Sequence, residues 1–184
     1  MTTVISPSTT YQLPRIYDIN SYLHDRVKGY GVRILFVCYG NACRSQMAEA
    51  LANQLGDGKV LASSAGTHPL GMISSDTRAV LGEKGITLEG HWSKGLEDVL
   101  VSDMDVVVEM GYGVKCKLPP DFKGRLVKWQ IPDPFLLGRE HFRDVRDLIE
   151  SEVRRLLAEL EVQDSKLETR NLKPENGDSE VEGG

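Results

Sequence analysis

One short segment of the chain combines residue types that suit chemistry on an anion: a thiol, a guanidinium six residues later and a hydroxyl directly after it. The segment is Cys38-Tyr39-Gly40-Asn41-Ala42-Cys43-Arg44-Ser45. The apolar run 32–37 before it is typical of a buried strand, and residues 46–51 after it indicate a helix. A loop between a strand and a helix turns backbone N–H groups and the positive end of the helix dipole toward an anion. The sequence therefore predicts an oxyanion site with a cysteine at its floor.

Each residue type in this loop suits a particular task. Gly40 lets the backbone approach an anion without a Cβ, and Asn41 tolerates a left-handed conformation and can pin the loop by a hydrogen bond. The planar fork of Arg44 matches two oxygens of a tetrahedral anion. The positive surroundings favour the thiolate of Cys38, which is the nucleophilic form. Ser45 is placed to donate a hydrogen bond to the sulfur.

A second candidate group lies far downstream, in Ile131-Pro132-Asp133-Pro134-Phe135, after the apolar run 126–130. The two prolines stiffen the backbone on either side of Asp133. Phosphoryl transfer to a thiolate needs an acid for the leaving oxygen and then a base for water, and one carboxylate can serve as both in turn. We expect Asp133 to do this.

Both predictions have a simpler alternative. A lone cysteine at the end of a core strand is usually a buried packing residue, and an Asp-Pro pair is common in turns. The context favours a catalytic role for Cys38. A predicted strand precedes it, a glycine and an asparagine follow it, and an arginine, a serine and a predicted helix come next.

The hydrophobic pattern predicts a single three-layer α/β domain with a four-stranded parallel sheet flanked by helices. The site is expected outside the carboxyl ends of the strands. In the last helix, apolar residues recur every three or four positions and form a core-facing stripe: Phe142, Val145, Ile149, Val153, Leu156 and Leu160. The expected strands are 32–38, 59–64, 104–109 and 126–130, and the expected helices are 44–55, 75–84 and 138–160.

The chain of 184 residues suits one domain with tails. We expect 1–31 to be an extension with one short helix beginning near Asp18, 32–162 to be the catalytic domain, and 163–184 to be a disordered acidic tail. The extension is expected to pack on the domain, with docking of a partner as the alternative.

Charge and composition narrow the class of protein. The net charge of -5 argues against a nucleic-acid partner. No apolar stretch approaches the length of a membrane span, and no signal peptide is recognised at the start, so no membrane partner is expected. Three cysteines without even pairing are most consistent with the reducing cytoplasm.

In its motifs the chain resembles a known family, the low-molecular-weight phosphotyrosine phosphatases together with the arsenate reductases that share their fold. The resemblance covers about residues 32–160. It implies a small parallel sheet, a cysteinyl-phosphate intermediate, and no metal or organic cofactor. It rests on four motifs in family order: 37–45, Ser64-Ala65-Gly66-Thr67, Gly85-Ile86-Thr87-Leu88 before His91 and Ser93, and Asp133-Pro134-Phe135.

Two subgroups of the family compete. Thioredoxin-coupled arsenate reductases carry two further cysteines about seven residues apart; Cys116 fits one of them, but the other position holds Glu109. Gln46 is typical of the reductases, whereas the Asp133 motif and the segment after it are more similar to the phosphatases. We favour a phosphatase, with arsenate reduction by an external thiol partner as the alternative.

The resemblance also bears on the remaining cysteine and on the substrate. It implies a reversible disulfide between Cys43 and Cys38, against the alternative of a small packing side chain. Cys116 is interpreted as an ordinary thiol, with a redox role as the alternative. The expected substrate is a phosphorylated protein or a small phosphoester. Tyr39 and Phe135 could flank an aromatic phosphoester, while Ala42 stands where phosphoarginine phosphatases tend to have threonine.

Overall fold

The structure is a computed structural model that describes residues 31–171, with side chains described as far as residue 161. Four strands form one parallel sheet in the order β2-β1-β3-β4. The strands are β1 Val32–Cys38, β2 Val60–Gly66, β3 Val106–Met110 and β4 Arg125–Trp129. The predicted four-stranded parallel sheet is confirmed, and the observed strands begin or end at most two residues away from the expected positions.

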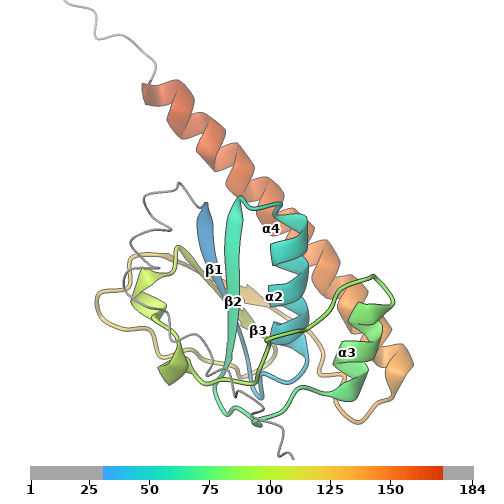
Figure 1. The fold of residues 1–184 in the computed structure, drawn as a ribbon. Helices are drawn as coiled ribbons and strands as arrows, with labels where there is room; N and C mark the ends of the chain where they lie inside the picture. The colour runs from blue at the N-terminus through green and yellow to red at the C-terminus, as the bar shows by residue number, and fades with distance from the viewer. Residues whose placement is uncertain (1–30, 172–184) are drawn as a thin grey trace, which may run out of the picture.

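Three α-helices cover one face of this sheet (Figure 1). Alternate residues of β1 point to the two faces, so Ile34, Phe36 and Cys38 belong to the core under the helices. Leu35 and Val37 belong to a smaller cluster on the other face, where the 3-10 helices η1 Leu96–Asp98 and η2 Val101–Asp103 and the chain near 113–122 lie. The helices are α2 Arg44–Leu55, α3 Ser75–Gly82 and α4 Arg139–Asn171.

The predicted stripe on the last helix is buried as expected: Phe142, Val145, Ile149, Val153 and Leu156 are each at most 5% exposed, and Leu160 packs at its edge. The predicted end of this helix was wrong, because α4 continues beyond 160 to Asn171. Residues 161–171 contain no glycine or proline and are rich in good helix formers. The helix therefore occupies the first part of the expected tail; the remainder, and the extension with its helix near Asp18, lie outside the described residues.

The order of the strands determines where a ligand can approach. The chain passes from β1 to β2 on one side of the sheet and then returns to β3 on the other side of β1. The loops that follow β1 and β3 therefore diverge, and such a switch point is the usual ligand site of an open parallel sheet. Cys38 is the last residue of β1 and stands at this point.

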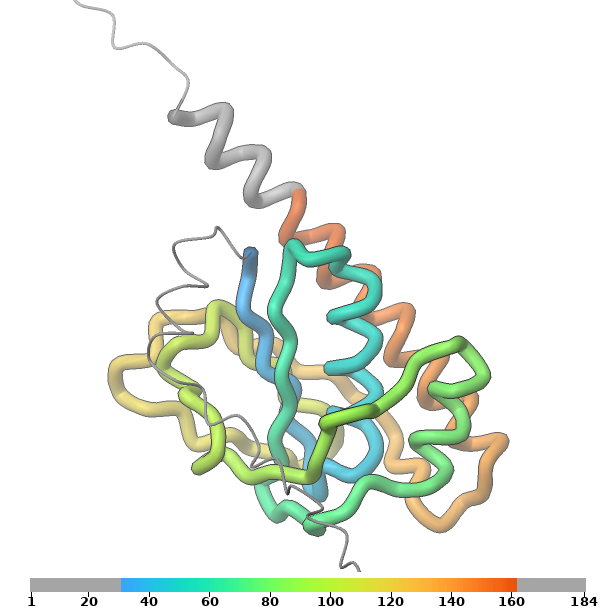
Figure 2. Tube along the Cα trace, in the orientation of Figure 1, coloured from blue at the N-terminus to red at the C-terminus, as the bar shows by residue number. Residues whose placement is uncertain are grey.

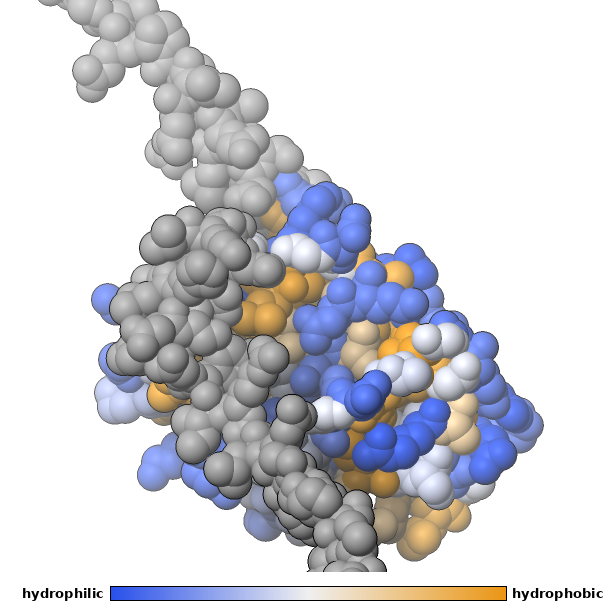
Figure 3. Space-filling view, in the orientation of Figure 1, coloured by the Kyte–Doolittle hydropathy of each residue, from blue (hydrophilic) through white to orange (hydrophobic). Residues whose placement is uncertain are grey.

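Within the described residues, no helix has the length and apolar content needed to cross a membrane. On the face seen in Figure 3, hydrophilic residues alternate with exposed apolar patches.

Candidate active site

The loop between β1 and α2 is held with its carbonyl groups on the outside. The neighbouring segment after β2, which runs alongside the loop in Figure 2, supplies the donors. Four bonds join them: Thr67 N to Cys38 O (3.0 Å), His68 N to Tyr39 O (2.8 Å), Leu70 N to Gly40 O (3.0 Å) and Ser74 N to Ala42 O (3.1 Å). The fifth carbonyl, that of Asn41, accepts from Gln46 Nε2 at 3.3 Å.

These outward carbonyls determine the direction of the amides. In a trans peptide the C=O and N–H groups point in opposite directions, so the N–H groups of residues 39–43 face the interior of the loop. One contact already shows this, since Asn41 N donates to Cys38 Sγ at 3.3 Å. The start of α2 at Arg44 adds the positive end of a helix dipole. A ring of this kind can bind a tetrahedral anion directly above the sulfur.

Cys38 Sγ also lies 2.9 Å from Ser45 Oγ, and the cysteine is 2% exposed. The side-chain amide of Asn41 determines which of these two atoms donates. Asn41 Oδ1 accepts from Gln46 Nε2 (2.9 Å) and from Lys94 N (2.8 Å), so the opposite end of the amide must be the Nδ2 donor. Because Nδ2 donates to Ser45 Oγ at 2.8 Å, the serine proton is free to point to the sulfur.

A partly buried carboxylate, that of Glu49, anchors the far end of this network. Ser64 Oγ accepts from Asn41 Nδ2 at 2.8 Å and donates to Glu49 Oε2 at 2.5 Å. Lys94 Nζ lies 3.3 Å from the same carboxylate oxygen, so a cation of the protein itself neutralises Glu49. His91 Nδ1 is 3.8 Å from Glu49 Oε1, and burial lowers the pKa of this histidine although the carboxylate opposes the shift. The loop thus rests on a charge-balanced scaffold.

Arg44 is buried, with 6% of its surface exposed, and is held by groups from two later segments of the chain. Its Nη1 donates to Met110 O (3.3 Å) and Ile131 O (3.4 Å), and its Nη2 donates to Asp133 Oδ2 at 2.5 Å. Its buried Nε has no hydrogen-bond partner among the described residues, which is costly unless an acceptor is bound. An N–H group without a partner beside the ring of amides is consistent with an anion as the ligand.

Gly111 makes room for this guanidinium. A Cβ on Gly111 would lie 2.3 Å from Arg44 Nη1, and the residue has φ of +117°, which side chains rarely adopt. The residue directly follows β3, so the end of a neighbouring strand shapes the wall of the site.

Asp133 stands at the mouth of the loop, where its side chain is 51% exposed. The other carboxylate oxygen, Oδ1, accepts from Phe135 N at 3.1 Å, which fixes the orientation of the carboxyl group. The structure therefore brings Asp133 to Arg44 and to the loop of Cys38, as the sequence predicts. Phe135 itself is 48% exposed beside it.

The other two cysteines have different surroundings from Cys38. Burial, followed by smaller contributions from Asp133 and Cys38, raises the pKa of Cys43 to about 11. Burial and the Glu109 carboxylate raise the pKa of Cys116 to about 11 as well. Cys116 N donates to Glu109 Oε1 at 2.7 Å, and both residues lie on the face of the sheet opposite to the Cys38 side chain. The thiols of Cys43 and Cys116 are therefore protonated at neutral pH.

The rim of the site carries an aromatic pair. The rings of Tyr39 and His68 are stacked, with centroids 4.5 Å apart and an angle of 17° between their planes. The sequence indicates Tyr39 as a residue that flanks the substrate; its stacking on His68 is seen only in the structure.

Other contributors also escape sequence reasoning. Gly111 could have been suspected as a glycine directly after a predicted strand, whereas Lys94 has no local signal. The sequence marks Ser93 only as part of a family motif; in the structure its Oγ donates to Gly40 O at 3.1 Å. Thr77 Oγ1 donates to Ala42 O at 3.0 Å. All of these act through contacts distant in sequence.

Comparisons with known proteins agree with this geometry. The sequence profile of the family described as "Low molecular weight phosphotyrosine protein phosphatase" matches residues 33–166. A protein of Synechocystis sp. named "Glutaredoxin arsenate reductase" is 36% identical over 131 residues, which cover 70% of this chain and 98% of that protein. The "Low molecular weight protein-tyrosine-phosphatase Wzb" of Escherichia coli (strain K12) is 32% identical over 133 residues, covering 66% and 90%.

A solved structure described as "An arsenate reductase in the phosphate binding state" superposes with a TM-score of 0.64. It is 36% identical, and the match covers 70% of this chain and 98% of that chain. The similar proteins thus bear two kinds of name, phosphatase and reductase, on one fold.

Proposed function

The chain belongs to the low molecular weight phosphotyrosine protein phosphatase family, and we propose that it hydrolyses phosphomonoesters, with protein phosphotyrosine as the substrate class. The observation that carries the proposal is the contact of 2.5 Å between Arg44 Nη2 and Asp133 Oδ2, because it puts a carboxylate at the mouth of a loop whose floor is Cys38. The exposed aromatic residues Tyr39 and Phe135 favour an aromatic ester.

In the first proposed step the thiolate of Cys38 attacks phosphorus from the floor of the loop. The bond between phosphorus and the leaving oxygen breaks, and protonated Asp133 gives its proton to that oxygen. The inward amides of 39–43 and the guanidinium of Arg44 stabilise the charge on the equatorial oxygens. The product alcohol leaves, and the phosphoryl group remains bonded to sulfur.

In the second step Asp133, now a carboxylate, takes a proton from water as the water oxygen attacks phosphorus. The bond between sulfur and phosphorus breaks, inorganic phosphate forms, and the thiolate returns. Ser45 aids this step because its hydroxyl proton points to the departing sulfur. An incoming dianion competes with Asp133 for Arg44, which frees the carboxyl group to meet the leaving oxygen.

Arsenate reduction is the second candidate, favoured by the similarity to the Synechocystis reductase and by Gln46. Cys38 would form a bond to arsenic with loss of water. A second thiol would then attack the Cys38 sulfur, so that the bond between sulfur and arsenic breaks, arsenite leaves with the bonding electron pair, and the two sulfurs end as a disulfide. Cys116 is poorly suited to be this second thiol, because it is protonated, lies on the opposite face and has Glu109 in place of a partner cysteine. In this candidate function the second thiol is external, such as glutathione.

The test measures both activities with the same purified variants. Cys38→Ser should abolish hydrolysis of p-nitrophenyl phosphate, and Asp133→Asn should lower kcat by about 10²–10⁴ with phenyl phosphate, whose leaving group needs the acid. Cys116→Ser and Asp144→Asn, an exposed carboxylate on α4, are the matched controls and should retain activity.

Hydrolysis that persists in Cys38→Ser would refute the phosphatase mechanism. Arsenite formed from arsenate and glutathione, at a rate that exceeds phosphoester turnover and is unaffected by Cys116→Ser, would favour the reductase instead.

A further inference from the structure

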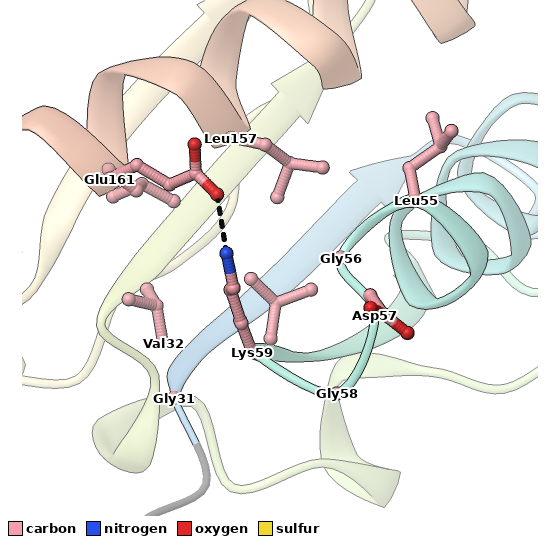
Figure 4. A pocket seen from close by; sticks show the side chains of 11 residues that line it. Gly31, Val32, Leu55, Gly56, Asp57, Gly58, Lys59, Leu157 and Glu161 are labelled. Atoms are coloured by element: carbon pink, nitrogen blue, oxygen red, sulfur yellow. Dashed lines mark hydrogen bonds and ion pairs between the residues drawn. The ribbon is translucent and has the colours of Figure 1, made fainter.

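A hollow of about 350 Å³ lies at the end of the sheet opposite to the active site. Val32 and Val60 begin β1 and β2 and are paired with each other, whereas Cys38 and Gly66 end the same two strands. Figure 4 shows the hollow between the start of these strands, the end of α2 and the later part of α4. It is therefore separate from the site described above.

The interior of this hollow is apolar and its edge is charged. Lys59 Nζ and Glu161 Oε1 form an ion pair of 3.0 Å between the start of β2 and α4. Figure 3 shows apolar surface exposed on this face near the beginning of β2. The apolar side chains that line the hollow are Val32, Leu55, Val60, Leu157 and Leu160. Covering such a surface with an apolar partner removes apolar area from water, which stabilises the folded protein.

The chain itself enters the described structure at this hollow. Gly31 is one of its lining residues, and a Cβ on Gly31 would lie 1.5 Å from the carbonyl oxygen of Lys59. The absence of a side chain lets residue 31 lie directly against the turn before β2. The residues that precede Gly31 therefore start at the edge of the hollow.

The preceding sequence has a pattern that matches the hollow. In residues 16–27, which lie outside the described residues, apolar side chains recur at helical spacing after the potential cap Asp18, and Gly29 follows the last of them. Four steps of the chain separate Val27 from Gly31 and span at most about 14 Å. The apolar positions after the cap are Ile19, Tyr22, Leu23 and Val27, and Ile16 lies just before it.

We propose that residues 18–28 form a helix whose apolar face occupies the hollow beside Val32, Leu55 and Leu160. The short tether gives this segment an effective concentration on the order of millimolar, which favours it over a second copy of the chain at ordinary protein concentrations. Docking there completes the core at the end of the sheet remote from Cys38, and it requires no change in the active site.

Hydrogen–deuterium exchange of the full chain, read by mass spectrometry, tests the proposal. Backbone amides of residues 20–27 should exchange at least about tenfold more slowly than an unstructured peptide of the same sequence. The double variant Leu157→Ser/Leu160→Ser should remove that protection. Leu148→Ser is the matched control, because Leu148 is a 39% exposed leucine of the same helix outside the hollow.

Protection of β1 amides in every variant verifies that the domain is folded. If the double variant does not fold, Leu23→Ser, with His24→Ser as its control, tests the same contact from the side of the segment. Three results would overturn the proposal: amides of 20–27 unprotected in the wild type, protection that survives the variants that should remove it, or protection that rises with protein concentration together with a dimer in sedimentation.

Discussion

Replacing Gly111 by alanine would put a methyl carbon 2.3 Å from Arg44 Nη1, a distance at which one of the two groups must move. The backbone at φ of +117° cannot easily yield, because it follows the last residue of a core strand. The guanidinium would therefore be displaced from Met110 O and Ile131 O, and its fork would no longer face the ring of amides.

The expected loss can be worked out from these contacts. A misplaced donor to a transition-state oxyanion costs about 10²–10³ in kcat, which is roughly 2.7–4 kcal/mol. The unfavourable backbone conformation of an alanine adds a destabilisation of about 1–3 kcal/mol. For a chain of this size that corresponds to a fall in Tm of roughly 2–12 °C.

The assay is hydrolysis of p-nitrophenyl phosphate at 25 °C, together with inhibition by inorganic phosphate and a thermal unfolding curve. Gly113→Ala is the matched control, since Gly113 also has a positive φ, of +73°, but a Cβ there meets nothing within 4 Å. It should show the loss in Tm without the loss in kcat. If Gly111→Ala matched Gly113→Ala in both kcat and phosphate affinity, the role assigned to Gly111 would be refuted.

Three further predictions concern the thiols and the stability of the domain. Ser45→Ala removes the hydroxyl 2.9 Å from Cys38 Sγ, and we expect kcat to fall by about 10–100-fold; an initial burst of nitrophenol in rapid-mixing experiments would show that the second step is slowed. Iodoacetamide at pH 7.5 should label Cys38 well before Cys43 and Cys116, whose pKa values are about 11, as read by peptide mass spectrometry; equal labelling would contradict this. Hydrogen bonds from two arginines of α4 lower the pKa of Glu83 from 4.5 to about 2, so its contribution to stability is present above pH 4.5 and is lost as the pH falls toward 2. Glu83→Gln should therefore show a smaller fall in Tm between pH 5 and pH 2.5, and an unchanged fall would count against the ion pair.

The same cradle explains why similar proteins bear two kinds of name. Phosphate and arsenate are both tetrahedral oxyanions, and a ring of amides with one guanidinium can bind either of them. The distinction between the two activities depends on what attacks the sulfur adduct, water or a thiol. In this chain, the exposed carboxylate of Asp133 suits the activation of water, and the buried Cys116 is poorly placed to attack.

The sequence alone was sufficient for the loop and for the elements beside it. Residues 38–45 are contiguous, so the residue types and spacing of the loop are visible in the sequence, although donors in residues 67–74 hold its carbonyls outward. The buried face of α4 was predicted for the same reason, because a helical period is a local property. The end of α4 was not predicted correctly, because the sequence contains no helix-breaking residue between residue 160 and Pro174.

Only the tertiary structure decided how the site is assembled. The position of Arg44 depends on Gly111, Ile131 and Asp133, which neighbour it only because β3 and β4 lie beside β1. Lys94 reaches Glu49 through a loop whose path has no periodic signal. Local patterns determine secondary structure, but contacts between residues far apart in sequence depend on strand order and register, and those are settled by packing of the whole core.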